Sequence, residues 1–269
     1  MYPEGPYDPP SAYRPYRAPV TTVPDEVPVA QAGFVDDVRA ALGVWRRFPA
    51  LPLLTTLFAV IAAAASSTWA GAPLAGLIAV FFLAWVGSER LWYLRAFTGR
   101  TLSPGAAVRA SFAYWGRFFC LFLWVGVLTI PLWVPAMVYG GYFDKDVIEG
   151  DGDIALWAIV YLAVGTLITD FLLTFVTPAI VYNSRRARTA IGIGLRLLRR
   201  TWPHAALYVV FPPLAVLLLT RFSTGPVGWG GAALIVVSSL VNLVAKGATA
   251  AYYLRVMPIT EPDGDIDLR

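Results

Sequence analysis

The chain has 269 residues, of which 58% are hydrophobic and only 14% are charged. Soluble domains carry about 25% charged residues, so this composition excludes an ordinary soluble domain and is typical of a polytopic membrane protein. The single cysteine, Cys120, excludes an internal disulfide, and the single histidine, His204, excludes a metal site built from several histidines.

The amino-terminal segment, residues 1–33, is rich in proline and tyrosine and has no apolar period. This composition predicts a disordered cytoplasmic tail, with a docking motif for a partner as the alternative reading. It does not read as a signal peptide, because it has no basic start followed by an apolar core. Residues 34–256 are predicted to form a transmembrane domain, and residues 257–269 a short acidic cytoplasmic tail.

Six apolar segments follow the tail. Crossing about 30 Å of hydrocarbon takes about 20 helical residues. The sequence therefore predicts an all-α fold with six transmembrane helices, near Phe48–Ser66, Pro73–Tyr93, Phe118–Tyr139, Ile154–Tyr182, Ala205–Thr220 and Gly231–Tyr253.

Basic residues are distributed unevenly between the two sides of these segments. With six spans, 18 arginines fall on the side of the two termini, whereas the other side holds only Lys145 and Arg221. Arginine and lysine accumulate in cytoplasmic loops. Both termini are therefore predicted to be cytoplasmic, in a bacterial plasma membrane. The net charge of +4 is explained by this topology, so nucleic-acid binding is not expected.

A short basic helix precedes every second span. The three segments VRAALGVW, VRASFAYW and LRLLRRTW each carry an arginine followed six residues later by a tryptophan. This pattern is typical of a helix lying in the membrane interface. The sequence thus predicts three repeats of an interfacial helix and a transmembrane hairpin, with interfacial anchors Arg39, Trp45, Arg109, Trp115, Arg196 and Trp202.

Two of these basic regions, Gly99–Phe119 and Thr177–Trp202, carry a family resemblance. They resemble bacterial, in particular actinobacterial, six-span membrane proteins of unassigned role. They are also similar to the membrane domain fused to some glycerophosphodiester phosphodiesterases. The similarity covers roughly residues 35–255 and includes no catalytic motif, so it implies a six-span fold and no enzymatic activity.

Asp170 lies inside the fourth apolar segment, where a charge costs roughly 2.5–3.5 kcal/mol at the bilayer centre. Polar residues recur at helical spacing around Asp170 and again around Lys246 on the sixth segment, which predicts two polar stripes that could face each other. The candidate intramembrane polar track comprises Thr166, Asp170, Thr174, Thr177, Ser239, Asn242, Lys246 and Thr249, with Glu89 and Arg90 as further candidate partners.

Two classes of function stay open from the sequence. The first is a non-catalytic scaffold, assembly or lipid-organising component of the membrane, in which Asp170 and Lys246 form a packing ion pair. The second is a small-solute or proton-coupled permease, or a permease subunit, that uses the two stripes. Catalytic and nucleotide-binding motifs are absent, so neither an enzyme nor a cofactor is expected; the expected partners are membrane lipids and another membrane protein or subunit.

Overall fold

The computed structural model describes residues 33–66, 72–141, 155–222 and 227–257, and the regular structure in these ranges is entirely helical. This confirms the all-α prediction; the two predicted tails fall almost wholly outside the described residues. The helices are α1 (Phe34–Arg47), α2 (Ala50–Ser66), α3 (Ala72–Phe97), α4 (Pro104–Tyr139), α6 (Leu156–Leu173), α7 (Val176–Tyr182), α8 (Ala187–Phe222) and α9 (Val227–Val256).

The connection between α3 and α4 follows from its sequence. Gly99, just after α3, has a φ of +76°, a left-handed conformation that glycine adopts at helix ends. The Ser103 hydroxyl then accepts a hydrogen bond from the backbone N–H of Ala106 at 3.2 Å, and Pro104 occupies the first turn of α4. These residues are a helix stop and a helix start in direct succession.

Helix α9 packs against four other helices, α1, α2, α3 and α8, and α3 packs in turn against α4. The largest fully buried side chains of the core are mostly aromatic, among them Trp85, Trp92, Tyr93, Tyr182 and Tyr253. Buried tyrosine and tryptophan each bring a polar atom that needs a partner. The core of this protein is therefore a place where hydrogen bonds have to be made.

Glycine lets α9 approach its neighbours closely. A Cβ atom added to Gly247 would lie 2.5 Å from the ring of Tyr93 on α3 and 2.7 Å from the Cβ of Ala41 on α1. No ordinary contact is that short, so a larger residue at position 247 would push these helices apart. Gly247 thus sets the distance between three helices at the centre of the fold.

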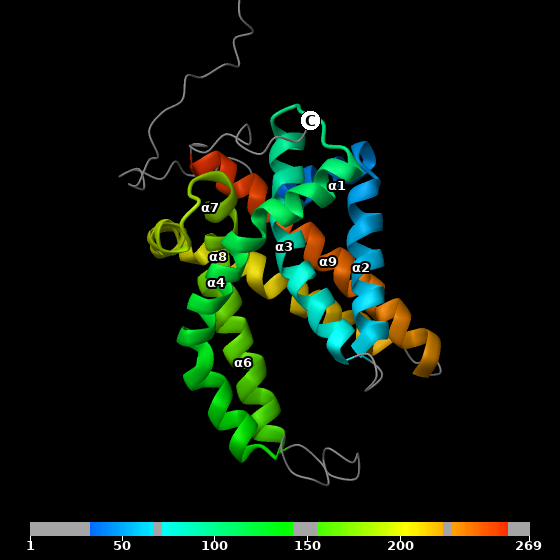
Figure 1. Ribbon diagram of the computed structural model, residues 1–269, viewed down its shortest axis with the longest axis vertical. Helices are drawn as coiled ribbons and strands as arrows, with labels where there is room; N and C mark the ends of the chain where they lie inside the picture. Colours follow the sequence, from blue (N-terminus) through cyan, green and yellow to red (C-terminus); the bar gives the residue numbers. More distant parts are fainter. Residues whose placement is uncertain (1–32, 67–71, 142–154, 223–226, 258–269) are drawn as a thin grey trace, which may run out of the picture.

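Helices α4 and α6 form a hairpin whose far end extends away from the other helices (Figure 1). Small residues join the two helices near this end, since a Cβ atom added to Gly140 would lie 2.4 Å from the Cβ of Ala158. Large apolar side chains cover the outside of the hairpin and are exposed, including Phe122, Val127 and Val164. The hairpin is a two-helix unit with little of its apolar surface buried inside the protein.

Three helices are long and apolar enough to cross a membrane, within α4, α6–α7 and α9. The bent pair α1–α2 makes a fourth if it is counted as one broken span. Helices α3 and α8 combine apolar parts with charged ones: α3 carries Glu89 and Arg90, and the first half of α8 carries several arginines. The described residues therefore contain three to four candidate spans, and six spans remain a prediction.

The three expected interfacial helices differ in the structure. The first is α1, a separate helix bent by 93° from the start of α2. The second, around Trp115, is an unbroken part of α4. The third belongs to α8, which has a kink at Thr201, with φ of −125°, two residues before Pro203. Proline cannot donate the hydrogen bond that would continue the preceding helix, whereas no proline follows Trp115 until Pro131. Three separate interfacial helices were therefore a wrong expectation for the second repeat.

The fourth predicted span is found as one candidate span, Leu156–Tyr182, with a local irregularity in its helix. Helix α6 ends at Leu173 and α7 begins at Val176, so Thr174 and Phe175 lie at a break. Phe175 is fully buried and its ring stacks on that of Tyr252, with 5.8 Å between the centroids. Phe175 and the α7 residues that follow it are buried in the core, whereas most of α6 before it is exposed.

Candidate functional site

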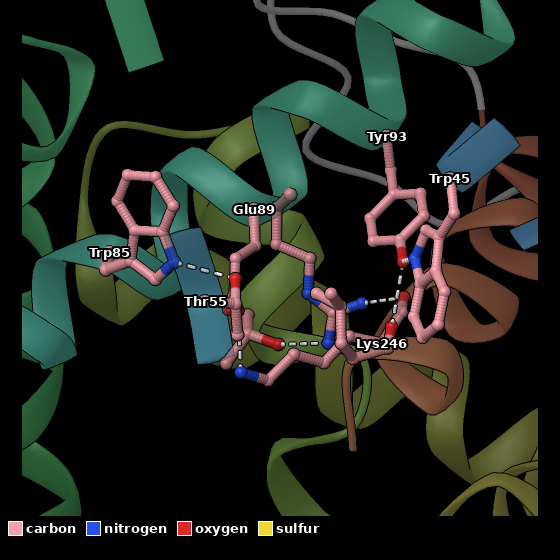
Figure 2. Close-up of polar contacts among 9 residues, drawn as sticks. Trp45, Thr55, Trp85, Glu89, Tyr93 and Lys246 are labelled. Atoms are coloured by element: carbon pink, nitrogen blue, oxygen red, sulfur yellow. Dashed lines mark hydrogen bonds and ion pairs between the residues drawn. The ribbon is translucent and has the colours of Figure 1, made fainter. Parts of the chain in front are cut away.

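The described part of the chain contains a buried ionic cluster centred on Glu89 of α3. Glu89 is fully buried, and its two carboxylate oxygens have different partners. Oε2 accepts a hydrogen bond from Lys246 Nζ on α9 at 2.6 Å, and Oε1 accepts one from the Thr55 hydroxyl on α2 at 2.9 Å. The indole N–H of Trp85 donates to the same hydroxyl at 3.0 Å (Figure 2). The cluster therefore joins α2, α3 and α9 through one carboxylate.

Arg90, the next residue of α3, extends the cluster towards α7. It is 5% exposed, and its guanidinium group donates to the backbone carbonyl of Lys246 and, at 3.1 Å, to the Thr177 hydroxyl. The Tyr182 hydroxyl donates to the backbone carbonyl of Arg90 at 2.8 Å. The Nε atom of Arg90 is buried and has no hydrogen-bond partner among the described residues. Arg90 is thus a buried cation held by neutral acceptors.

One turn further along α3, Tyr93 bonds to both neighbouring helices. Its hydroxyl accepts a hydrogen bond from the indole N–H of Trp45 on α1 at 2.9 Å and donates to the backbone carbonyl of Leu243 on α9 at 3.0 Å (Figure 2). Both polar capacities of the phenol are used. Trp45, predicted as an interfacial anchor, is therefore half-buried and fixes α1 to the core.

A second buried ionic cluster joins the first and last described helices. The carboxylate of Asp37 on α1 is fully buried and accepts two hydrogen bonds from the guanidinium group of Arg255 on α9, one of them at 2.6 Å. The Tyr208 hydroxyl on α8 donates to the same carboxylate at 2.5 Å. Bidentate arginine–carboxylate pairs are among the strongest hydrogen-bonded contacts in proteins. This cluster holds α1, α8 and α9 together.

The two predicted polar stripes do not face each other along their length. Helix α6 packs on α4 and α8, whereas α9 packs on α1, α2, α3 and α8. Three threonine hydroxyls of the stripes bond to carbonyls of their own helices at 2.8 Å, namely those of Thr166, Thr174 and Thr249.

Asp170 and Lys246 do not form the ion pair that the sequence suggested. Lys246 pairs with Glu89 instead, one of the further partners considered from the sequence. Asp170 is exposed on α6. Of the other stripe residues, Thr177 reaches Arg90, Asn242 is exposed and Ser239 is half-buried. The cluster around Glu89 thus includes one residue of each stripe, Thr177 and Lys246, but the two stripes do not lie against each other.

The remaining predicted anchors lie on the surface. Trp115 is 44% exposed and Trp202 60% exposed, and Arg109 and Arg196 are exposed too. Arg39 forms an exposed ion pair with Asp36 in α1, at 3.4 Å. These positions suit side chains that contact lipid headgroups.

Sequence reasoning missed Asp37, Arg255 and Tyr208 as members of a site. Asp37 stands beside Asp36 in the first turn of α1, where acidic residues favour the positive end of the helix dipole and give no sign of a distant partner. A stronger signal was available on α3, where Ser88, Glu89 and Arg90 stand together in an apolar helix. Three consecutive polar residues place polar groups on most sides of a helix, which predicts partners on more than one neighbour.

The clusters consist of carboxylates, cations and hydroxyls that bond to one another, with Arg90 Nε left without a partner among the described residues. Among the described residues, no three His, Cys, Asp or Glu side chains are grouped as metal ligands would be. His204 stacks on the ring of Tyr252, with 5.7 Å between the centroids, and Cys120 is exposed. The arrangement can bind helices to one another through charge, and it can hold or pass a proton between neighbouring oxygen and nitrogen atoms.

In comparisons with protein-family models, with curated proteins and with solved structures, no match to this chain is found.

Proposed function

We propose that the chain is an integral protein of the bacterial plasma membrane that crosses the bilayer six times and acts as a non-catalytic scaffold, assembly or lipid-organising component. The apolar helices within α4, α6–α7 and α9 support membrane insertion, since each is long enough to span the hydrocarbon. The resemblance to six-span bacterial proteins points in the same direction.

The proposed orientation, with both termini in the cytoplasm, draws on contacts between basic segments. Asp37 of α1 bonds to Arg255 at the end of α9, and the hydroxyl of Tyr253 bonds to Asn183 in the α7–α8 connection at 2.7 Å. The amino-terminal helix, the α7–α8 connection and the end of α9 therefore lie at one end of the molecule. All three segments are rich in arginine, as cytoplasmic surfaces are.

One observation carries the structural role: each fully buried carboxylate of the two clusters bonds to partners from two other helices. Glu89 is bound from α2 and α9, and Asp37 from α8 and α9. A carboxylate that moved protons or solutes would need exchangeable contacts with water. Partners fixed on both sides instead favour cross-bracing of a helix bundle.

The exposed α4–α6 hairpin supplies the surface through which such a component would act. Its large apolar side chains suit lipid chains or the helix of another membrane protein, and the arginines at the cytoplasmic end suit anionic headgroups. A basic residue near an anionic membrane surface contributes about 1 kcal/mol of binding.

A permease remains the second candidate, and the position of Asp170 favours it. Thr166, Asp170 and Asn242 are exposed on helices that would lie in the membrane, and the side chain of Lys246 is 24% exposed. Exposed polar groups at that depth are what a hydrated path requires.

Water access to these positions separates the two candidates. Single cysteines replace Thr166 or Asn242 in a Cys120→Ala chain, in sealed vesicles, and a membrane-impermeant thiol reagent is added from either side. If the chain is a scaffold, both positions should be labelled as slowly as a lipid-facing control such as Val164→Cys. If both positions are labelled nearly as fast as a cysteine in a loop, the scaffold proposal is wrong and the permease is favoured.

A further inference from the structure

The cluster around Glu89 has an unbalanced charge. Lys246 and Arg90 are two cations, while Glu89 is the one carboxylate that bonds to either of them among the described residues. The guanidinium group of Arg90 reaches only a carbonyl and a hydroxyl, and its Nε atom has no partner in the described structure. Buried charges are stable when they are paired, so the cluster lacks one negative charge.

Asp170 is a negative charge that bonds to no cation among the described residues. It is exposed on an apolar helix, where the surrounding medium would be lipid, and a carboxylate there is unfavourable. One movement that brought Asp170 to Lys246 would neutralise the cluster and remove the exposed carboxylate from lipid. The ammonium group has three N–H donors, so it can bind Asp170 while it keeps its bond to Glu89.

The chain around Asp170 is built for such a movement. After Asp170 in the chain, α7 is fixed by two contacts. Thr177 bonds to Arg90. A Cβ atom added to Gly194 of α8 would lie 2.7 Å from the backbone nitrogen of Val176. Between the fixed part and α6 is the break at Thr174 and Phe175. A break between a fixed segment and an exposed one is where a hinge absorbs a change in direction.

Helix α4 offers a matching point of flexure. Leu121 is buried, and beyond it the described residues of the helix are mainly exposed until Ala136 packs near the far end of the hairpin. Gly126 follows five residues after Leu121, and the hydroxyl of Thr129 bonds to the carbonyls of Val125 and Gly126, a contact that bends helices. The hairpin can therefore pivot as a unit, because both of its helices weaken near the core.

We propose that the α4–α6 hairpin closes against α9 and that Asp170 is its latch, pairing with Lys246 in the closed form. The open arrangement seen in the structure is then one of two states, and a lipid or a partner helix that occupies the space beside α6 would hold the hairpin open. This inference rests on the proposed membrane insertion, because an exposed aspartate is unfavourable against lipid and not against water.

Electron spin resonance distances between α6 and α9 test the latch. Spin labels are placed at Thr166→Cys and Asn242→Cys in a Cys120→Ala chain, one helical turn before Asp170 and Lys246 on the same faces, with the full chain in lipid nanodiscs. We expect a short and a long distance population. Asp170→Asn should lower the short population relative to the long one by about five- to thirtyfold, the range for one intramembrane polar contact.

Matched variants make the outcome specific. Asp170→Glu should retain the short population, and Asp36→Asn on the surface of α1 should leave both populations unchanged. A single long distance in every variant, or a short population that survives Asp170→Asn, overturns the latch. So does a short population that depends on anionic lipid and not on Asp170, since a lipid phosphate would then be the missing anion. Flotation of the reconstituted chain with vesicles reports membrane insertion separately, so failure of the proposed function is recognised before any distance is measured.

Discussion

The core around α3 and α9 and the hairpin of α4 and α6 are built on opposite principles. In the core, charged and aromatic polar groups are buried and paired, as Glu89 with Lys246 and Asp37 with Arg255. In the hairpin, apolar side chains such as Trp124 and Val160 are exposed, and Asp170 is the charged residue of α6. Figure 1 shows the two regions diverging from a shared end.

This difference indicates what stabilises each region. The core is held by contacts within the protein, so it should respond strongly to single substitutions in any solvent. The hairpin depends on what surrounds it, because apolar surface is stable against lipid and unstable against water. The following variants test that distinction in detergent micelles, from the largest expected effect to the smallest.

Breaking the central ion pair should have the largest effect. Lys246→Leu leaves the carboxylate of Glu89 buried without its cation, and such a change costs about 3–5 kcal/mol in free energy of unfolding. The double variant Glu89→Leu/Lys246→Leu removes both charges and should recover most of that loss. Thermal unfolding in detergent measures both, with Arg39→Leu in the exposed pair of α1 as the control. A Lys246→Leu protein as stable as the parent would show that the pair does not brace the core.

Crowding the central helix crossing should come next. Gly247→Ala places a Cβ atom 2.5 Å from the ring of Tyr93, and overpacking of this kind costs about 1–3 kcal/mol. Gly192 of α8 has no atom within 4 Å of an added Cβ. The matched variant Gly192→Ala should therefore be neutral or stabilise α8, because alanine favours helix. Equal unfolding temperatures for the two variants would contradict the close approach of α9 to α3.

Removing one hydrogen bond from the second cluster should have a smaller effect. Tyr208→Phe deletes the hydroxyl that donates to Asp37 but leaves the carboxylate bound to Arg255, so we expect a loss of about 1.5 kcal/mol, the lower end for a hydrogen bond to a charged group. Tyr161→Phe removes a hydroxyl from the exposed face of α6 and serves as the control. Denaturant titration compares the two. A larger loss from Tyr161→Phe would place an undetected contact on the hairpin.

Trimming the hairpin surface should have the smallest effect. Val164→Ala removes exposed apolar atoms from α6, and in detergent we expect a change within about 0.5 kcal/mol. Leu243→Ala at a fully buried position of α9 should instead cost about 2–5 kcal/mol. If both variants lower the free energy of unfolding by the same amount, Val164 is covered by protein, and the hairpin does not differ from the core in the way proposed.

The sequence predicted the helical class and the position of most helices, because the length of an apolar segment is a local feature. It did not predict that α6 stops at Leu173, although Pro178 is a local sign: proline has no N–H to donate to the carbonyl of Thr174, four residues earlier.

The site was harder to predict for a physical reason. The periodicity of Asp170 and Lys246 fixes which face of a helix each residue occupies, but not which helix lies opposite. The partner of Lys246 depends on tertiary packing, and α3 lies against α9 where α6 was expected. The same limitation applies to Asp37, whose partner Arg255 is 218 residues away in the chain.

The bond between Asp37 and Arg255 also imposes an order on synthesis. At bacterial and eukaryotic elongation rates of about 5–20 residues per second, the ribosome needs roughly 10–45 s to add the 218 residues that separate the two side chains. During that interval the aspartate on α1 has no cation from α9. The bond of Trp45 to Tyr93 on α3 spans only 48 residues, so α1 can be fixed to α3 well before Asp37 meets Arg255.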